Sequence, residues 1–230
     1  MKLVLHNYWR SSASHRVRIG LGLKQLAYEY VAVNIVQGAQ LEVSYRDMNS
    51  SAQVPTLEVV EDDGSRRLLV QSLPILEYLE DRFADHPILP ADHYLRARAR
   101  GLAEIINSGI QPHQNLTTTK KLESLGVTVA PWVKSFIAEG MIAYAKACDR
   151  IAGQFSVGDA PSIADCCLVP QLASARRFHV LKDNAWDQSI PGIKDQLPKL
   201  SRLLEIEAHC LAIKAFADAM PDQQPDAVKS

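Results

Sequence analysis

Serine and arginine side chains that can bind an anion lie together near the start of the chain, in the run RSSASHR at positions 10–16. The run follows the short apolar segment 3–5 and leads into a helical pattern, so the serines stand where a strand passes into a helix. The first helical turn has unpaired N–H groups and the positive end of the helix dipole, and it can hold an anion. A serine hydroxyl there can also donate a hydrogen bond to a thiolate and favour its ionised form. The alternative is that the serines only cap the helix.

Composition restricts the classes of protein to which the chain can belong. The chain has 230 residues, 47% of them hydrophobic, and a formal net charge of −1, which suits one large or two small globular domains. Nucleic-acid-binding proteins usually show a basic surplus or stripe, and this chain has neither, so we expect no nucleic-acid partner. No apolar run approaches the roughly 18 to 20 residues of a membrane span, and the start turns polar too early for a signal peptide. We therefore expect no membrane partner.

The cysteines indicate a reducing compartment. Cys148, Cys166, Cys167 and Cys210 form no CxxC pair and no metal-ligand spacing with histidine. We expect no metal site and no structural disulfide, which suits a cytoplasmic protein. The adjacent Cys166 and Cys167 lie in an apolar stretch and are expected to be buried core residues.

The first third of the chain alternates between strand and helix patterns. A helix is expected over 12–25, a helical turn over 41–48, and a further helix from Ser72, which suits the N-cap position. The order is βαβ and then ββα, which predicts an α/β, thioredoxin-like domain over residues 1–84. The expected strands are 3–7, 28–33, 53–60 and 66–70.

Beyond a proline-containing linker at 85–92, only helical periodicity is evident. Ser162 and Asp165 have the spacing of a capping box at the start of one of the helices. We expect no strand here, and the pattern predicts an all-helical domain over residues 93–230. The expected helices are 93–121, 130–151, 162–178 and 197–219.

Six segments, in the same order and spread over nearly the whole chain, resemble the zeta class of glutathione transferases. The run SSASHRVRI at 11–19 is similar to the signature SSCSxRVRIA, and QVPTL at 53–57 is similar to the segment that holds a cis-proline. The other matching segments are QSL at 71–73 with ILEYLE at 75–80, GIQPHQNL at 109–116, VGD at 157–159 through ADCCLVPQ at 164–171, and QPD at 224–226. The resemblance implies the glutathione transferase fold, with a thioredoxin-like domain followed by an all-helical domain.

The resemblance also implies glutathione as cofactor and a set of residues that hold it. Ser12 would hold the sulfur with Ser11 as a helper, and the backbone of Val54 before a cis Pro55 would pair with the cysteinyl backbone of glutathione. An ordinary trans proline at the start of a strand is the alternative for Pro55. The other implied glutathione-binding residues are Ser14, His15, Arg16, Gln40, Gln71, Ser72, Gln111, Asn115 and Thr117.

Three arginines, Arg10, Arg16 and Arg177, are candidates for the carboxylates of a substrate, because a guanidinium binds a carboxylate through two hydrogen bonds. Arg177 aligns with the arginine that precedes a phenylalanine in the family, and Arg10 lies beside the serines. A solvated surface charge or an intramolecular salt bridge is the alternative for any one of the three. Ala13 stands where the family signature has a cysteine, so that thiol plays no part in this chain.

The implied function is glutathione-dependent cis–trans isomerisation of maleylacetoacetate to fumarylacetoacetate in phenylalanine and tyrosine catabolism, by a homodimer. One alternative is a maleylpyruvate isomerase, or a transferase or dehalogenase acting on small α-halo acids. Another is a non-catalytic binding protein with the same fold. The presence of Ser12, Val54–Pro55 and Gln71–Ser72 argues against that last alternative, because a scaffold has no need of a ligand site.

Overall fold

Two compact units make up the protein in this computed structural model, which describes residues 1–228. Unit 1 contains Met1–Ile88 and the C-terminal segment from Ala212 onwards, and unit 2 contains Leu89–Leu211. The sequence predicts residues 93–230 as one helical domain, of which the last two residues lie outside the described part. The contacts instead group the C-terminal segment with unit 1, because helix α10 (Lys214–Ala219) packs against α1 (Ser12–Leu23).

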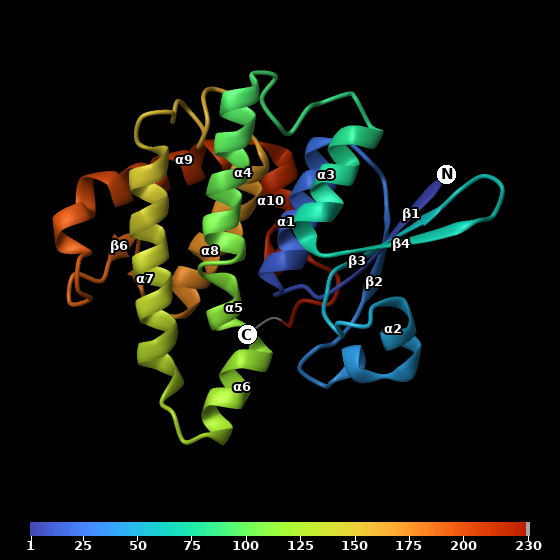
Figure 1. Cartoon of the computed structure of the whole chain (residues 1–230), viewed down its shortest axis with the longest axis horizontal. Coiled ribbons are helices and arrows are strands. Elements are labelled where there is room, and N and C mark those ends of the chain that lie inside the picture. The colour runs from blue at the N-terminus through green and yellow to red at the C-terminus, as the bar shows by residue number, and fades with distance from the viewer. Residues whose placement is uncertain (229–230) are drawn as a thin grey trace. The chain divides into compact units, whose positions relative to one another are not determined.

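A mixed four-stranded sheet forms the centre of unit 1 (Figure 1). Its order is β2-β1-β3-β4, with β2 parallel to β1 and the other neighbours antiparallel. This architecture confirms the predicted thioredoxin-like fold class, and each predicted strand is present within a few residues. The strands are β1 (Lys2–Asn7), β2 (Glu29–Ala32), β3 (Thr56–Val60) and β4 (Arg66–Val70).

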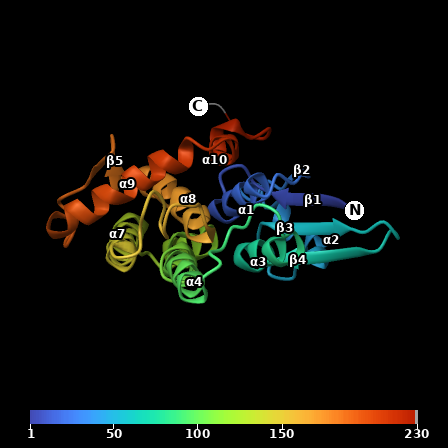
Figure 2. The same cartoon turned by 90° about the horizontal axis from the view of Figure 1, so that it is seen from above.

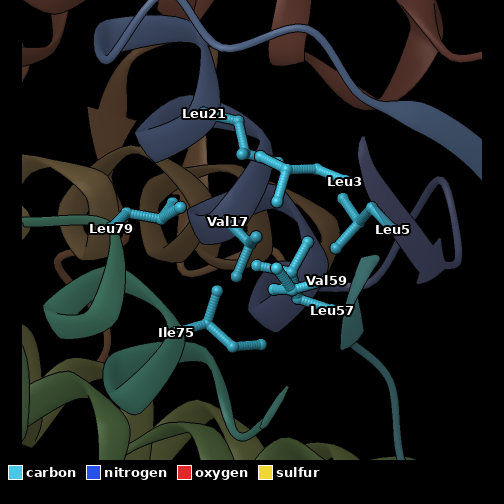
Figure 3. Packing of buried hydrophobic residues seen from close by; sticks show 8 residues of the cluster. All are labelled: Leu3, Leu5, Val17, Leu21, Leu57, Val59, Ile75 and Leu79. Carbon is cyan, nitrogen blue, oxygen red and sulfur yellow. The ribbon is translucent and has the colours of Figure 1, made fainter. Parts of the chain in front are cut away.

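The core of unit 1 lies between the sheet and two neighbouring helices, α1 and α3 (Ser72–Arg82). Alternate strand residues and helix residues spaced four apart point toward one another in Figure 3, as the two backbone periods require. Each fully buried aliphatic side chain of this kind contributes roughly 1.5–3 kcal/mol to folding. The cluster drawn in Figure 3 contains Leu3, Leu5, Val17, Leu21, Leu57, Val59, Ile75 and Leu79. The predicted helical turn at 41–48 appears as the 3-10 turn η1 (Ala39–Leu41) and the short helix α2 (Val43–Met48).

Gly20 allows α1 and α3 to approach closely. A Cβ atom at this position would lie 2.2 Å from Cδ2 of Leu76, well inside van der Waals contact. The glycine weakens α1 as a helix by about 1 kcal/mol relative to alanine. The missing methyl group leaves room for Leu76, which is fully buried.

Unit 2 is built mainly from helices, and α4 packs against both α7 and α8 (Figures 1 and 2). The predicted helix 93–121 is divided into α4, α5 and α6, because Pro112 lies in the first turn of α5 and the side chain of Asn115 caps α6. The predicted helix 197–219 is likewise divided into α9 and α10. The helices of unit 2 are α4 (His93–Asn107), α5 (Gln111–Gln114), α6 (Leu116–Ser124), α7 (Val129–Cys148), α8 (Ile163–Arg177) and α9 (Leu197–Leu211), with the 3-10 turn η2 (Lys194–Gln196) before α9.

The expectation of no strand beyond the linker is wrong. Two-residue strands β5 (Leu181–Lys182) and β6 (Ala185–Trp186) form a small antiparallel hairpin. Asp183 and Asn184 connect them, both with positive φ (49° and 58°). Asp and Asn are residues that tolerate this left-handed connection, but strands of two residues leave no periodic signal in the sequence.

The sequence predicts no membrane-spanning helix, no metal site and no disulfide. No helix among the described residues is both long enough and apolar enough to span a bilayer. No group of three or more His, Cys, Asp or Glu side chains in that part of the chain could hold a metal ion. The four cysteines are free and buried, and burial raises the pKa of the Cys166 thiol well above its ordinary value.

The predicted capping box is present at the start of α8, and it is deeply buried. The Asp165 carboxylate accepts hydrogen bonds from the N–H groups of Ser156 and Ser162, each at 2.8 Å. It also accepts one from the Ser162 hydroxyl at 3.1 Å. Asp165 is fully buried, so it ties the preceding loop to the helix in a place that water does not reach.

We expect Asp165→Ala to lower the free energy of unfolding by about 3 kcal/mol, because two buried N–H groups would lose their acceptor at a cost of about 1–3 kcal/mol each. Urea denaturation of the purified protein measures this change. Asp149→Ala is the control, since it removes only an exposed pair with Lys199 and should change stability by less than about 1 kcal/mol. Equal losses in the two variants would contradict the structural role of the box.

Candidate functional site

The register of the sheet brings three of the sequence motifs to one end of it. His6 of β1 lies opposite Thr56 of β3, and Thr56 lies opposite Val70 of β4. The residues that follow β1, precede β3 and follow β4 therefore emerge at the same end, here called the serine edge. They are the loop 8–11 before α1, the pair Val54–Pro55, and the pair Gln71–Ser72.

Ser11 and Ser12 have different roles at the start of α1. Ser11 is the N-cap, and its Oγ accepts a hydrogen bond from the Ser14 N–H at 3.2 Å. Ser12 is the first helical residue and is partly exposed. Its hydroxyl forms no hydrogen bond with any other residue of the described chain, and the first turn of α1 contains no acidic residue. The Ser12 hydroxyl can therefore interact with an anionic sulfur. Ser14 is buried, and its Oγ accepts from the Tyr8 N–H at 3.5 Å.

A buried guanidinium fixes the loop that leads to these serines. Arg18 is 2% exposed, and its NH1 group donates to Asn7 Oδ1 at 3.0 Å and to the Tyr8 carbonyl at 3.4 Å. Its NH2 group donates to the carbonyls of Trp9 at 3.0 Å and Ala219 at 3.1 Å, and Nε donates to Ala219 at 3.2 Å. A guanidinium has five N–H donors, so every donor of Arg18 has an acceptor.

The cis-proline prediction is confirmed, since the Val54–Pro55 peptide bond is cis. Two side chains hold Gln53, the residue before Val54. The Tyr45 hydroxyl donates to the Gln53 carbonyl at 2.6 Å, and Asn49 Nδ2 donates to the same carbonyl at 2.8 Å. The backbone of Val54 itself has no hydrogen bond to another residue within 1–228. Its N–H and C=O groups are thus available to an extended peptide.

The sequence prediction that Ser72 is the N-cap of α3 is wrong. Gln71 occupies the N-cap position with a φ of 69°, and Ser72 is the first residue of the helix. Arg16 of α1 is the physical reason, because its NH1 group donates to Ser72 Oγ at 3.2 Å in the buried interior. Since this bond uses a lone pair of the hydroxyl, the Ser72 proton stays available to donate to a ligand.

His15, which lies beside Arg16 in α1, is 1% exposed. Burial and the charges of Arg18 and Arg16 lower the pKa of His15 well below its ordinary value of 6.5. The imidazole is therefore neutral at neutral pH. Neither His15 nor Arg16 presents an exposed side chain to a ligand.

Gln40 lies in η1, and its Oε1 is buried without a hydrogen-bond partner among the described residues. A buried amide oxygen without a partner costs free energy, and a donor from a bound peptide would satisfy it. Arg10, by contrast, is exposed, with its guanidinium 5.3 Å from the centre of the Trp9 ring.

Four predicted site residues belong to unit 2. Gln111 begins α5, and Asn115 caps α6 by accepting from the Thr117 N–H at 3.0 Å, with Thr117 itself exposed. Arg177 is the exposed last residue of α8, with its guanidinium 4.6 Å from the centre of the Phe178 ring.

A pair of buried amides joins α5 to α8 in unit 2. Gln114 Nε2 donates to Gln171 Oε1 at 3.0 Å, and Gln171 Nε2 donates back to Gln114 Oε1 at 3.3 Å. This reciprocal pair fixes the helix that carries Gln111 against the helix that ends at Arg177.

Sequence reasoning missed the residues that position the serine edge. Arg18, Tyr45 and Asn49 lie in or beside helical patterns, and no local spacing connects them with the carbonyls that they bind. Asp226 stands in one of the matching segments, but the segment alone assigns it no contact.

The comparisons with known proteins identify the family. Residues 10–82 match the model for the glutathione S-transferase N-terminal domain. A probable maleylacetoacetate isomerase of Drosophila melanogaster is 38% identical, over 97% of this chain and 89% of the relative. A crystal structure of maleylacetoacetate isomerase from Anaeromyxobacter dehalogenans, with glutathione in its active site, is 44% identical with a TM-score of 0.84, covering 99% of this chain and 98% of that one. The chain belongs to the zeta class of glutathione transferases.

This zeta-class transferase also has relatives with a second activity. A maleylpyruvate isomerase of a Ralstonia species is 36% identical, over 96% of this chain and 98% of the relative. Overall identity therefore does not separate the two isomerases, and the choice between them depends on individual residues.

The buried histidine makes the stability of this zeta-class chain depend on pH. His15 takes up a proton in the unfolded chain below about pH 6.5 but not in the folded one, so stability contributed by the neutral ring is present above that pH and lost below it. The loss approaches about 1.4 kcal/mol per pH unit. Urea denaturation between pH 7.5 and 5 should therefore show a shallower decline for His15→Asn than for the wild type. Parallel curves would contradict this interpretation of His15.

Proposed function

We propose that the protein is a glutathione-dependent cis–trans isomerase that converts maleylacetoacetate to fumarylacetoacetate. The observation that carries the proposal is the serine edge. Three features emerge there at one end of the sheet: the Ser12 hydroxyl at a helix start, the backbone of Val54 before cis-Pro55, and the Gln71–Ser72 pair. Within residues 1–228 neither the Ser12 hydroxyl nor the Val54 backbone has a hydrogen-bond partner. These groups match the sulfur, the peptide backbone and the γ-glutamyl carboxylate of glutathione.

The proposal gives the glutathione-binding residues of unit 1 direct and indirect roles. Val54 pairs with the cysteinyl backbone, and the N-terminus of α3 with the Ser72 hydroxyl binds the γ-glutamyl carboxylate. Arg16 acts indirectly, because it orients the Ser72 hydroxyl and adds positive charge beneath it. His15 also acts indirectly, as a neutral packing residue of α1. Gln40 accepts a donor from the bound peptide through its buried amide oxygen, which has no partner in the described part of the chain.

Ser12 activates the sulfur by donating a hydrogen bond from its hydroxyl to the thiolate, which favours the ionised form, assisted by the positive end of α1. The thiolate adds to one carbon of the cis double bond, and the π electrons move through the conjugated system to form an enolate. Rotation about the resulting single bond follows. The enolate then re-forms its carbonyl and the trans double bond as the carbon–sulfur bond breaks, so glutathione is regenerated.

The developing enolate and the substrate carboxylates need cationic or donor groups. Arg10 and Arg177 are proposed for the carboxylates, since both are exposed arginines and each is stacked on an aromatic ring. Gln111, Asn115 and Thr117 of unit 2 complete the proposed ligand-binding set. Ser11, which caps α1, and the buried Ser14 act indirectly by holding the start of that helix. We place the reaction in the cytoplasm and in phenylalanine and tyrosine catabolism.

Maleylpyruvate isomerisation is the second candidate, because the maleylpyruvate isomerase of the Ralstonia species is similar to this chain over nearly its whole length. The segment after Asn115 reads Leu-Thr-Thr-Thr before its first lysine. The family resemblance implies a more basic stretch there in a maleylpyruvate isomerase, to hold a second carboxylate. This difference favours maleylacetoacetate.

Purified protein should isomerise maleylacetone, a stable stand-in for maleylacetoacetate, faster than maleylpyruvate, and only when glutathione is present. Ser12→Ala should lower kcat by at least about tenfold, because the thiolate loses its hydroxyl donor. Ser51→Ala, an exposed serine outside the site, is the control and should keep wild-type activity. Turnover of neither compound would overturn the proposed function, and unchanged turnover in Ser12→Ala would remove Ser12 from its role.

A homodimer is part of the proposal, on the basis of the family resemblance. Light scattering on the eluate of a gel-filtration column should give about twice the 25.5 kDa of one chain at micromolar concentration. A mass equal to one chain at that concentration would contradict it.

A further inference from the structure

The C-terminal segment of unit 1 reaches back to the loop that carries the serines. Asp226, about as far from this loop in sequence as the chain allows, accepts a hydrogen bond from the Trp9 N–H at 3.2 Å through Oδ2. Its other oxygen accepts from the hydroxyl of Tyr30, which lies in β2. The Asp226 carboxylate therefore joins the loop 8–11 to β2, an outer strand of the sheet.

Trp9 is held at its carbonyl as well as at its N–H. The carbonyl accepts from Arg18 NH2 at 3.0 Å, and the same nitrogen of Arg18 donates to the Ala219 carbonyl at 3.1 Å. Both polar backbone groups of Trp9 thus depend on residues of the C-terminal segment, one directly and one through Arg18. Only Arg10 and Ser11 separate this residue from Ser12.

The segment is itself well anchored. Phe216 of α10 is fully buried, and α10 packs against α1. Gln224 is buried, and its Nε2 donates to the carbonyls of Asp218 and Met220, each at 2.8 Å. Asp226 therefore follows from a fixed turn, so its carboxylate can impose a position on the loop.

We propose that Asp226 is a positioning residue, which sets the place of Ser12 and Arg10 through the backbone of Trp9. The expected effect of Asp226 on turnover rests on the proposed function. The expected effect on the position of the loop 8–11 does not. It also explains the segment QPD at 224–226, in which Gln224 closes the turn, Pro225 leads out of it, and Asp226 fixes the loop.

Asp226 also balances the charge of Arg18. Burial lowers the pKa of Arg18 to about 10, whereas Tyr30, Tyr28 and Asp226 act in the opposite direction. Removing the carboxylate would leave the Trp9 N–H without its acceptor and the guanidinium without this compensating charge. An asparagine keeps an acceptor for Trp9 and can donate from its amide to the phenolic oxygen of Tyr30, so it should preserve most of the geometry.

The test compares Asp226→Ala, Asp226→Asn and the control Asp222→Ala, which changes an exposed acid of the same segment. In Asp226→Ala, hydrogen–deuterium exchange over residues 8–12 of the unliganded protein should become at least about tenfold faster, and kcat for maleylacetone should fall at least about tenfold. The KM for glutathione should change less than about twofold, because Val54 and Ser72 bind glutathione without Asp226.

In Asp226→Ala, titration of the thiolate absorbance should show a raised pKa for the thiol of bound glutathione. Asp226→Asn should recover most of each effect, and Asp222→Ala should match the wild type.

Two results would overturn the inference. One is wild-type exchange over residues 8–12 in Asp226→Ala. The other is an equal fall in kcat in Asp226→Ala and Asp226→Asn, accompanied in both variants by a higher KM for glutathione and a lower melting temperature. That combination is expected of general destabilisation. A wild-type protein without isomerase activity would instead overturn the proposed function, and the exchange experiment would still decide whether Asp226 positions the loop.

Discussion

A guanidinium buried in unit 1 imposes the strictest constraint on the described fold. A charge removed from water is tolerated only when each of its donors meets an acceptor, and Arg18 meets Asn7 Oδ1 and the carbonyls of Tyr8, Trp9 and Ala219. These acceptors come from the end of β1, from the loop after it and from α10. The position of that loop is therefore determined by an electrostatic requirement inside the unit, and the serines at its end take their place as a result.

The chemistry at the serine edge follows from this rigid base. A hydroxyl polarises a sulfur only over hydrogen-bond distance and in a suitable direction, so the loop before Ser12 has to be fixed before any ligand arrives. The structure fixes the neighbouring motifs by separate means. Tyr45 and Asn49 hold the residue before Val54–Pro55, and Arg16 holds the hydroxyl of Ser72. Each piece of the site thus rests on its own polar contact, which is buried for Ser72 and partly buried beside Val54–Pro55.

Local patterns in the sequence are sufficient to predict most of the fold and the motifs of the site. Short runs of apolar, β-branched or aromatic residues mark the four strands of the main sheet, and Ser162 with Asp165 marks the buried capping box. The failures arise where a distant group decides a local state. Ser72 has the side chain of an N-cap, but Arg16 takes its oxygen. The end of the chain has the pattern of the helical domain, whereas the acceptor that Arg18 needs at Ala219 draws it to unit 1. Periodicity carries no information about such pairings, because the partners are separated by tens to hundreds of residues.

The close approach of α1 and α3 has a consequence for exchanging sequence with relatives. Gly20 stands where the family signature has alanine, and the space of that methyl group is filled by the side chain of Leu76. The two positions are therefore coupled. A chimera that imports the first helix of a relative with alanine there would force Leu76 aside, unless the third helix came with it. In a chimera of this protein and a relative, the crossover points are best placed outside the stretch from Gly20 to Leu76, so that both residues come from the same parent.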